Sequence, residues 1–158
     1  MHILMCNDDG ILADGLRRLA SYLSQYYRIT VVAPANEQSA KSHALTTEIP
    51  LKLDAYNGED ENPRLYALTG TPSDCMKFGL SYLLSDDMPD LVISGINHGF
   101  NLGSDVLYSG TVSAAMESCF YGIPGLALSV ERYSPERGDE MHPFIHELIE
   151  KIYVKGNF

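Results

Sequence analysis

Apolar residues along this chain form short continuous runs, separated by stretches in which they are more widely spaced. Short continuous runs are typical of strands buried on both faces of a parallel sheet. Between the runs, apolar residues recur every three or four positions, which is the spacing of one helix face. Because strands alternate with helices, we expect a three-layer α/β fold, with a mostly parallel sheet covered by helices on both faces. The runs that predict strands are His2–Cys6, Arg28–Ala33, Asp90–Ser94 and Gly125–Val130.

The first half of the chain contains two predicted helices. One carries its apolar positions on a single face, with Arg17 and Arg18 on the opposite side. The other begins near Thr71. The Thr71 hydroxyl can cap this helix, and Pro72 and Asp74 are both favoured in a first turn. The apolar positions of the first helix are Leu12, Leu16, Leu19, Ala20 and Leu23.

The second half of the chain contains two more predicted helices. Residues Thr111–Tyr121 form the first, and Pro143–Tyr153 form the second, which lies near the end of the sequence. Helical spacing in the first of them predicts an apolar face that packs inward. The residues expected on that face are Val112, Ala115, Met116, Cys119 and Phe120.

A small antiparallel excursion is predicted between the second strand and the second helix. Thr46–Tyr56 and Arg64–Leu68 alternate loosely between apolar and polar residues, and the polar turn Asn57–Asp60 lies between them. Ala35–Leu45 is polar and is expected to form a loop.

Length and composition indicate one domain, residues 1–158, with a substantial core. Hydrophobic residues make up 45% of the chain, which excludes an intrinsically disordered protein. The formal net charge is −10 and the pI is about 4.7. Binding to duplex nucleic acid depends on Lys and Arg neutralising phosphates, so we expect no such partner. A small anionic substrate is still compatible with this charge, because a bound cation can reverse the local sign.

The three cysteines Cys6, Cys75 and Cys119 do not have the number or spacing of a disulfide framework. Each lies in an apolar stretch, so we expect reduced core thiols. No secretory signal pattern and no apolar run long enough to cross a bilayer are present. We therefore expect a cytoplasmic protein with no membrane partner.

Polar side chains follow three of the predicted strands. The segments are Asn7–Gly10, Asn36–Ser39 and Ser94–Gly103. The carboxyl ends of parallel strands meet at one edge of a sheet, where such folds bind ligands. These segments supply only oxygen ligands, which favour Mg²⁺ or Mn²⁺ over zinc. A divalent ion would also remove the repulsion between the adjacent carboxylates of Asp8 and Asp9.

The stretch Ser109-Gly110-Thr111 begins a predicted helix. Free backbone N–H groups and the helix dipole favour an anion there. A metal site beside a helix N-terminus suits a phosphate monoester, whose oxygens could contact both.

Each of these features also has a structural interpretation. Asp8 and Asp9 can form a turn and a helix cap, and Ser109-Gly110-Thr111 can cap its own helix. Ser39 and Asn97 can be ordinary loop and turn residues. The glycines between Ser94 and Gly103 match neither GxGxxG nor a Walker A loop.

Four histidines and one acidic pair are further candidate groups. His98 could act as a general acid, although a single loop histidine is more often structural or solvated, and the same holds for His43. His142 and His146 are spaced as a possible metal pair, but their segment HPFIH lacks the glutamate of HExxH, so we expect surface histidines. Asp86 and Asp87 precede a strand, at the opposite edge of the sheet, and are expected to be solvated.

Five motifs together resemble the survival protein E (SurE) nucleotidase family. They are ILMCNDDG, VVAPANEQSAKSHALT, ALTGTPSDC, PDLVISGINHGFNLGSDVLYSGTVSAAMES and GIPGLALS, in this order. The resemblance implies a Rossmann-like α/β fold and a divalent-metal-dependent phosphatase that acts on nucleoside monophosphates.

The resemblance also implies roles for individual residues. The ligands of one Mg²⁺ or Mn²⁺ ion would be Asp8, Asp9, Ser39 and Asn97. Asn101 and the turn Ser109-Gly110-Thr111 would contact the phosphate. Our hypothesis for the catalytic residues is that Asp8 or Asp9 activates the attacking water.

Members of the SurE family continue well past the length of this chain, which ends at Phe158. We therefore expect a chain that lacks the C-terminal segment of the family, with exposed apolar surface where that segment would pack. For the full-length protein, the resemblance implies a homo-oligomer, either a dimer or a tetramer.

Two alternatives to a metal-dependent 5'-nucleotidase are considered. The first is a module that binds nucleotide and metal without turnover. The second is a phosphatase that forms an aspartyl phosphate, in which a strand-terminal Asp is the nucleophile. The chain lacks the DxD spacing of one such class, and Ser94 and Asn97 stand where a receiver domain would need an acceptor Asp.

Overall fold

The computed structural model describes residues 1–58 and 60–151 and contains a six-stranded sheet in the order β3-β4-β2-β1-β5-β6. β1 lies between β2 and β5 and is parallel to both, and only β3 runs antiparallel to its neighbour β4. The strands are β1 (His2–Cys6), β2 (Arg28–Pro34), β3 (Leu53–Ala55), β4 (Arg64–Leu68), β5 (Leu91–His98) and β6 (Gly125–Val130).

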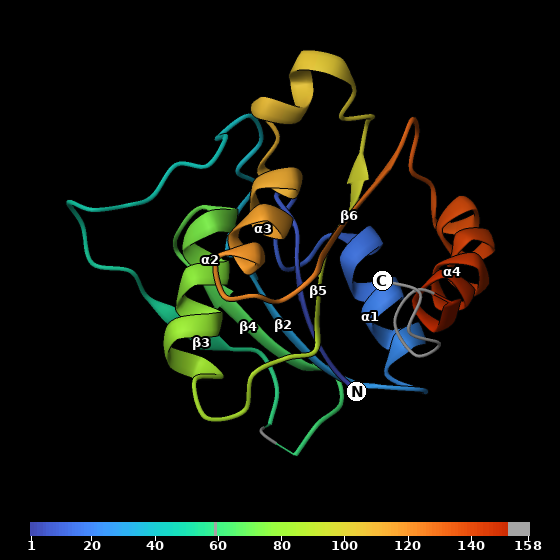
Figure 1. Ribbon diagram of the computed structural model, residues 1–158, viewed down its shortest axis with the longest axis horizontal. Coiled ribbons are helices and arrows are strands. Elements are labelled where there is room, and N and C mark those ends of the chain that lie inside the picture. The colour runs from blue at the N-terminus through green and yellow to red at the C-terminus, as the bar shows by residue number, and fades with distance from the viewer. Residues whose placement is uncertain (59, 152–158) are drawn as a thin grey trace.

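Helices cover both faces of this sheet, as predicted (Figure 1). The pair α1 and α4 lies on one side, and the pair α2 and α3 lies on the other. The helices are α1 (Asp14–Leu23), α2 (Pro72–Phe78), α3 (Gly110–Cys119) and α4 (Pro135–Ile149), with a π-helical turn η1 (Gly79–Leu83) and a 3-10 turn η2 (Gly103–Leu107). The prediction of a three-layer, mostly parallel α/β fold is confirmed. No helix in the described ranges is long and apolar enough to cross a membrane.

The central strand β1 shows why its apolar run is continuous. Ile3 and Met5 belong to the core beneath α1 and α4, whereas Leu4 and Cys6 belong to the core beneath α2 and α3. Successive side chains of a strand point to opposite faces, so a strand covered on both faces needs apolar residues at every position.

The start of α2 follows its sequence signals. The Thr71 hydroxyl accepts a hydrogen bond from the Asp74 backbone N–H, and the Asp74 carboxylate accepts one from the Thr71 backbone N–H. Pro72 occupies the first turn, where its missing N–H is not needed.

The predicted antiparallel excursion is also present, but it is shorter than predicted, because only Leu53–Ala55 pairs with β4.

The beginning of α1 differs from the prediction. Leu12 was expected on its buried face, yet the helix begins at Asp14 and Leu12 is 59% exposed. Gly10 adopts a positive φ of 102°, and the backbone N–H of Ile11 donates to Pro34 O at 2.8 Å. This turn directs Ile11 into the core in place of Leu12.

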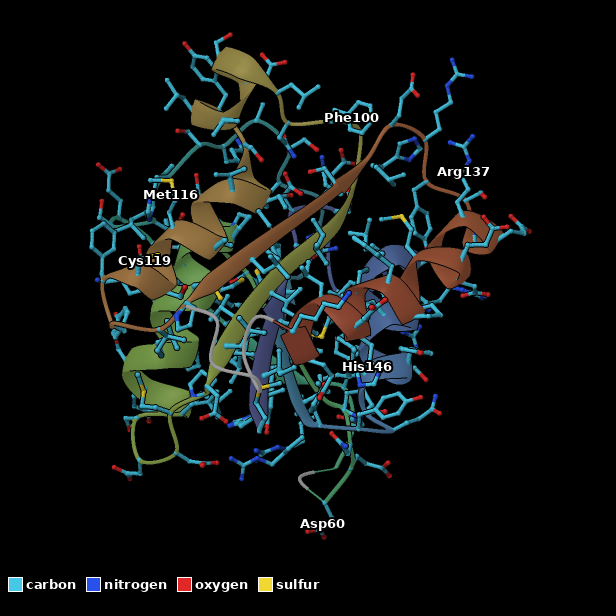
Figure 2. The ribbon with its side chains drawn as sticks, turned by 45° about the vertical axis from the view of Figure 1, so that its right-hand side comes forward. Asp60, Phe100, Met116, Cys119, Arg137 and His146 are labelled. Atoms are coloured by element: carbon cyan, nitrogen blue, oxygen red, sulfur yellow. The ribbon has the colours of Figure 1, made fainter. Side chains whose placement is uncertain are left out.

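The prediction for the inward face of α3 is largely wrong. Met116 is 48% exposed and Phe120 is 75% exposed. Cys119 is also exposed, so the prediction of a core thiol is wrong for Cys119, whereas Cys6 and Cys75 are buried. Figure 2 shows Met116 and Cys119 on the outer side of the helix. The helix packs so closely on β6 that a Cβ at Gly125 would lie 2.2 Å from Ala115 O. Such a close approach favours small residues inward, and the buried ones include Ser113, Ala114 and Ser118.

The last described helix, α4, begins earlier than predicted. Ser134 caps it by accepting a hydrogen bond from the Arg137 N–H, and Pro135 occupies its first turn. Pro143, the predicted start, lies inside the helix. The polar residues after Pro135 carry no helical apolar period, so the pattern predicted only the second half. The predicted end at Tyr153 lies outside the described residues.

The two histidines of α4 are not both on the surface. His142 is buried against α1, with its ring centroid 5.2 Å from that of Tyr22, and His146 stacks on Tyr26 at 4.1 Å. The prediction of surface histidines is therefore wrong for His142. Its contact with Tyr22 of α1 joins two helices far apart in the sequence, which a single-sequence pattern does not show.

A leucine pair tests the boundary of α1. Leu16 is completely buried, so we expect Leu16→Ala to lower the free energy of unfolding by about 2–5 kcal/mol. Leu12→Ala, its matched control, should change it by about 0.5 kcal/mol or less. Urea unfolding followed by circular dichroism measures both. Equal losses would contradict the observed boundary.

A second prediction concerns the acid sensitivity of the α1–α4 contact. Burial lowers the pKa of His142 below its ordinary value, and its Nε2 has no hydrogen-bond partner among the described residues. The unfolded chain therefore takes up this proton first as the pH falls, so the free energy of unfolding should decrease below about pH 6.5. Urea unfolding at about pH 7.5 and about pH 5.5 should show a smaller decrease for His142→Phe than for the unchanged chain. The same decrease in both would show that His142 does not carry the effect.

Candidate functional site

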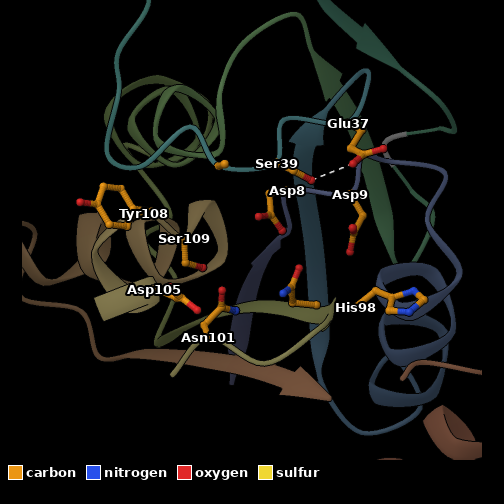
Figure 3. Close-up of a pocket in the computed structure, with 11 residues that line it drawn as sticks. Asp8, Asp9, Glu37, Ser39, His98, Asn101, Asp105, Tyr108 and Ser109 are labelled. Carbon is orange, nitrogen blue, oxygen red and sulfur yellow. Dashed lines mark hydrogen bonds between the residues drawn. The ribbon is translucent and has the colours of Figure 1, made fainter. Parts of the chain in front are cut away.

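A cavity of about 540 Å³ lies at the carboxyl edge of the sheet, where the segments after β1, β2 and β5 meet (Figure 3). The prediction that these segments converge is therefore confirmed. The lining residues are Asp8, Asp9, Glu37, Ser39, Ala40, Asn97, His98, Asn101, Asp105, Tyr108 and Ser109.

Asp8 is held rigidly at the end of β1. The side chain of Asn7 donates to Gly10 O at 3.0 Å and accepts from the Gly10 N–H at 3.1 Å, which fixes the turn around both aspartates. The Thr111 hydroxyl donates to Asp8 Oδ1 at 2.7 Å. A Cβ at Gly110 would lie 2.9 Å from the Cβ of Asp8, so only glycine allows α3 to approach this closely.

Both aspartates lie in an environment that disfavours their charge. Asp8 is only 5% exposed and Asp9 is half-buried. Burial raises the pKa of both carboxyl groups above the ordinary value, and the neighbouring charge of Asp8 raises the pKa of Asp9 further. In Figure 3 both carboxyl groups point into the same open space. A cation between them would relieve this repulsion.

Ser39 reaches the cavity from the segment that follows β2. The backbone N–H of Gln38 donates to Asp8 O at 2.7 Å, which ties this segment to the end of β1. The Ser39 hydroxyl donates to Glu37 Oε1 at 2.7 Å, so its oxygen lone pairs remain available to a ligand.

Asn97 reaches the cavity from β5, which continues to His98 instead of ending at Ser94 as predicted. The pairing of β5 with β6 shifts register between Ser94 and Asn97, and Gly95 has a positive φ of 121° there. The side-chain nitrogen of Asn97 donates to Gly99 O at 2.8 Å, which leaves its amide oxygen as a potential ligand.

The residues predicted to contact phosphate are only partly in the cavity lining. Asn101 and Ser109 line it, and the Asn101 side chain donates to Ser129 Oγ at 2.7 Å. Gly110 and Thr111 are buried behind it. Ser109 also accepts from the Val112 N–H at 3.1 Å, so it is the N-cap of α3.

Several lining residues were not singled out from the sequence. Glu37 and Ala40 flank Ser39, and Asp105 and Tyr108 lie in or beside η2. They belong to irregular segments, where no period distinguishes a lining residue from a solvated one. Only their position near the predicted ligands could have indicated them.

The available donors fit a hard divalent cation. The side chains of Asp8, Asp9, Ser39 and Asn97 offer oxygens, which are the ligands that Mg²⁺ and Mn²⁺ prefer. Because four protein ligands do not fill the coordination sphere of such an ion, water and substrate could also bind to it. Within residues 1–58 and 60–151, no three His, Cys, Asp or Glu residues form a metal-binding group. The set therefore differs from a transition-metal site rich in histidine or cysteine.

The other candidate groups lie elsewhere. His142 packs against Tyr22 of α1 and His146 stacks on Tyr26, and neither histidine lines the cavity. Asp87 forms an exposed ion pair with Arg28 at 2.7 Å, as expected for a solvated loop. His43 does not line the cavity but contacts Glu117.

Comparison with known proteins gives a consistent result. A family model described as "Survival protein SurE" matches residues 3–157. A protein of a Thermoanaerobacter species named "5'-nucleotidase SurE" is 49% identical over 156 residues, which are 99% of this chain and 61% of that protein. A protein of the same name from Caldanaerobacter subterraneus subsp. tengcongensis is 48% identical over 98% of this chain and 60% of its own length.

Solved structures agree with the sequence comparison. A crystal structure of "Sure Protein" from Aquifex aeolicus superposes with a TM-score of 0.84 and 38% identity, over 96% of this chain and 60% of that one. The chain thus spans about three fifths of the length of the relatives that it matches. Since the family model covers nearly the whole chain, the chain belongs to the survival protein SurE family.

Proposed function

We propose that this chain carries the active site of a divalent-metal-dependent 5'-nucleotidase, which hydrolyses nucleoside 5'-monophosphates to nucleoside and phosphate. The observation that carries the proposal is the pair of desolvated carboxylates, Asp8 and Asp9, at an open cavity lined by oxygen donors. The N-terminus of α3 lies beside them, because Thr111 contacts Asp8 directly. The names of the relatives support the reaction class.

The proposed ligands of one Mg²⁺ or Mn²⁺ ion are Asp8, Asp9, Ser39 and Asn97. When bound there, the ion would supply a Lewis acid for the phosphoryl oxygens and lower the pKa of water. This chain would position that ion with two carboxylates fixed by the turn of Asn7 and Gly10.

The remaining residues act on the substrate in this proposal. Asn101 and Ser109 line the cavity and can donate to phosphate oxygens, while the first turn of α3 offers its dipole to the same anion. Asp8 or Asp9 accepts the proton of the attacking water. Both carboxyl groups point into the cavity, where such a water would lie (Figure 3).

The biological setting is also part of the proposal. The partner is a small nucleotide and not duplex nucleic acid, given the formal charge of −10. We place the reaction in the cytoplasm and expect the full-length protein to form a homo-oligomer, a dimer or a tetramer. The exposed apolar residues Met116, on α3, and Phe120, which follows its last residue, are consistent with burial against further protein.

The first experiment measures inorganic phosphate released from AMP and GMP with EDTA, Mg²⁺ or Mn²⁺. We expect release that requires the metal and falls about 100-fold or more in Asp8→Asn, since the variant loses a ligand charge. Asp9→Asn, assayed in parallel with metal bound, should also lose turnover; if it keeps full turnover, Asp9 is not the base.

The controls of this assay separate the alternatives. Release that continues unchanged in EDTA would contradict a metal-dependent mechanism. A chain that binds Mn²⁺ and AMP without releasing phosphate would be a binding module. A trapped phospho-enzyme would establish the aspartyl-phosphate mechanism instead.

A glycine substitution tests the close contact between α3 and β1. In Gly110→Ala the new methyl group would lie 2.9 Å from the Cβ of Asp8 and 3.1 Å from the Cγ of Pro72, so Asp8 must move. We expect Mn²⁺ affinity, measured by calorimetry, to weaken about 10- to 100-fold. Gly58→Ala is the control, because its nearest neighbour would be the Cγ of Glu61 at 3.8 Å. Unchanged affinity in Gly110→Ala would contradict the proposed role of this contact.

A further inference from the structure

The segment that carries Ser39 has no regular structure to hold it. Residues 35–52 connect β2 to β3 and contain neither helix nor strand. Within it, Ala40 and Ser42 have positive φ angles of 55° and 52°. Residues with a side chain rarely adopt this conformation, which persists only where surrounding contacts impose it. The contacts of this segment therefore determine where Ser39 lies.

Several of these contacts come from α2 and η2. The backbone N–H of Ser42 donates to Tyr108 O at 3.0 Å, and its hydroxyl donates to Leu107 O at 2.7 Å. The Thr46 hydroxyl donates to the carboxylate of Asp74 at 2.7 Å. Asp74 also caps α2, so its removal would disturb the helix as well as the segment.

One further contact, from α3, joins a histidine of this segment to a buried carboxylate. The Nε2 of His43 donates to Glu117 Oε2 at 2.6 Å. The Glu117 side chain is 6% exposed and that of His43 is 28% exposed. A buried carboxylate is costly unless it is paired, and His43 is the only side-chain partner of this carboxylate among the described residues. The pair therefore fixes His43, four positions after Ser39, against a rigid helix.

The same helix also holds Asp8. Thr111, in the first turn of α3, donates to the Asp8 carboxylate, and Glu117 follows about two turns later. α3 thus contacts two segments that reach the cavity from different strands. One of its side chains orients a proposed ligand directly, and the other holds the segment of a second proposed ligand.

We infer that Glu117 is a positioning residue that acts through His43 and sets Ser39 in place for the divalent ion. This inference rests on the proposed function, because the role of Ser39 as a ligand belongs to that proposal. Glu117 does not line the cavity, so its role would be to position another residue and not to bind substrate or metal itself.

Three variants isolate this contact. Glu117→Ala removes the acceptor and leaves a residue that favours helix, so α3 should stay intact. Glu117→Gln keeps an oxygen acceptor for His43. Asp87→Ala is the matched control, because it also removes a carboxylate from an ion pair. Neither Asp87 nor its partner Arg28 lines the cavity.

Two measurements on the 158-residue chain test the inference at a temperature where circular dichroism shows every variant folded. Calorimetry gives the Kd for Mn²⁺, and hydrogen exchange gives the protection of residues 36–46, where the N–H groups of Gln38, Ser42 and Thr46 are hydrogen-bonded. We expect Glu117→Ala to weaken Mn²⁺ binding about tenfold and to speed this exchange. Glu117→Gln and Asp87→Ala should stay within about twofold of the unchanged chain.

A double variant shows whether the effect passes through Ser39. Ser39→Ala should weaken Mn²⁺ binding, and adding Glu117→Ala to it should change the Kd by about twofold or less, because the shared contact is already lost. An unchanged Kd in Glu117→Ala or in Ser39→Ala would overturn the inference. The inference would also be overturned if adding Glu117→Ala to Ser39→Ala weakened Mn²⁺ binding by as much as Glu117→Ala does alone.

These readouts distinguish failure of the inference from failure of the proposed function. If the unchanged chain binds no Mn²⁺, the metal site of the proposal fails. Hydrogen exchange then still tests the His43–Glu117 contact. Faster exchange of residues 36–46 in Glu117→Ala but not in Glu117→Gln would support it, and identical exchange in all variants would overturn it.

Discussion

The parallel pairing of β1 with β2 and β5 is the constraint on which the rest of the structure depends. It buries β1 on both faces, which demands an apolar residue at every position from Ile3 to Cys6. It also brings the carboxyl ends of three strands to one edge. The polar residues at or just beyond those carboxyl ends, including Asp8, Ser39 and Asn97, then line one cavity. The cavity is thus a consequence of the sheet order and of the segments at its edge.

The electrostatics of this edge and the packing of α3 are linked. Two neighbouring carboxylates are partly removed from water, and burial raises the pKa of both. Such an arrangement costs stability unless a cation or hydrogen bonds compensate it. The Thr111 hydroxyl supplies one such hydrogen bond, and Gly110 allows the approach that makes it possible. Small residues on the inner face of α3 therefore serve the site as well as the packing.

Much of the fold could be predicted because its signals are local. The continuous runs predicted the buried strands, and Thr71, Pro72 and Asp74 predicted the start of α2. The errors occurred where packing overrides the pattern. Met116 and Phe120 have helical spacing but point outward, because the tight contact of α3 with β6 admits only small residues.

The site residues, like the fold, could be predicted only where the sequence carries a local signal. Asp8, Asp9, Ser39 and Asn97 could be grouped from the sequence because each follows a predicted strand, and the structure brings all four to one cavity. Their roles as ligands stay a prediction. The contact of His43 with Glu117 joins residues 74 positions apart, and neither lies at a strand end. Nothing local in the sequence indicates such a pair, so it was visible only in the structure.

The central claim is that the carboxyl edge of this sheet forms a single divalent-cation site. It is tested most directly by the anomalous diffraction of Mn²⁺ in crystals of the chain. The account predicts one strong anomalous peak, bounded by the oxygens of Asp8, Asp9, Ser39 and Asn97. A peak at another position, such as beside His142 and His146, with none at this edge, would contradict it.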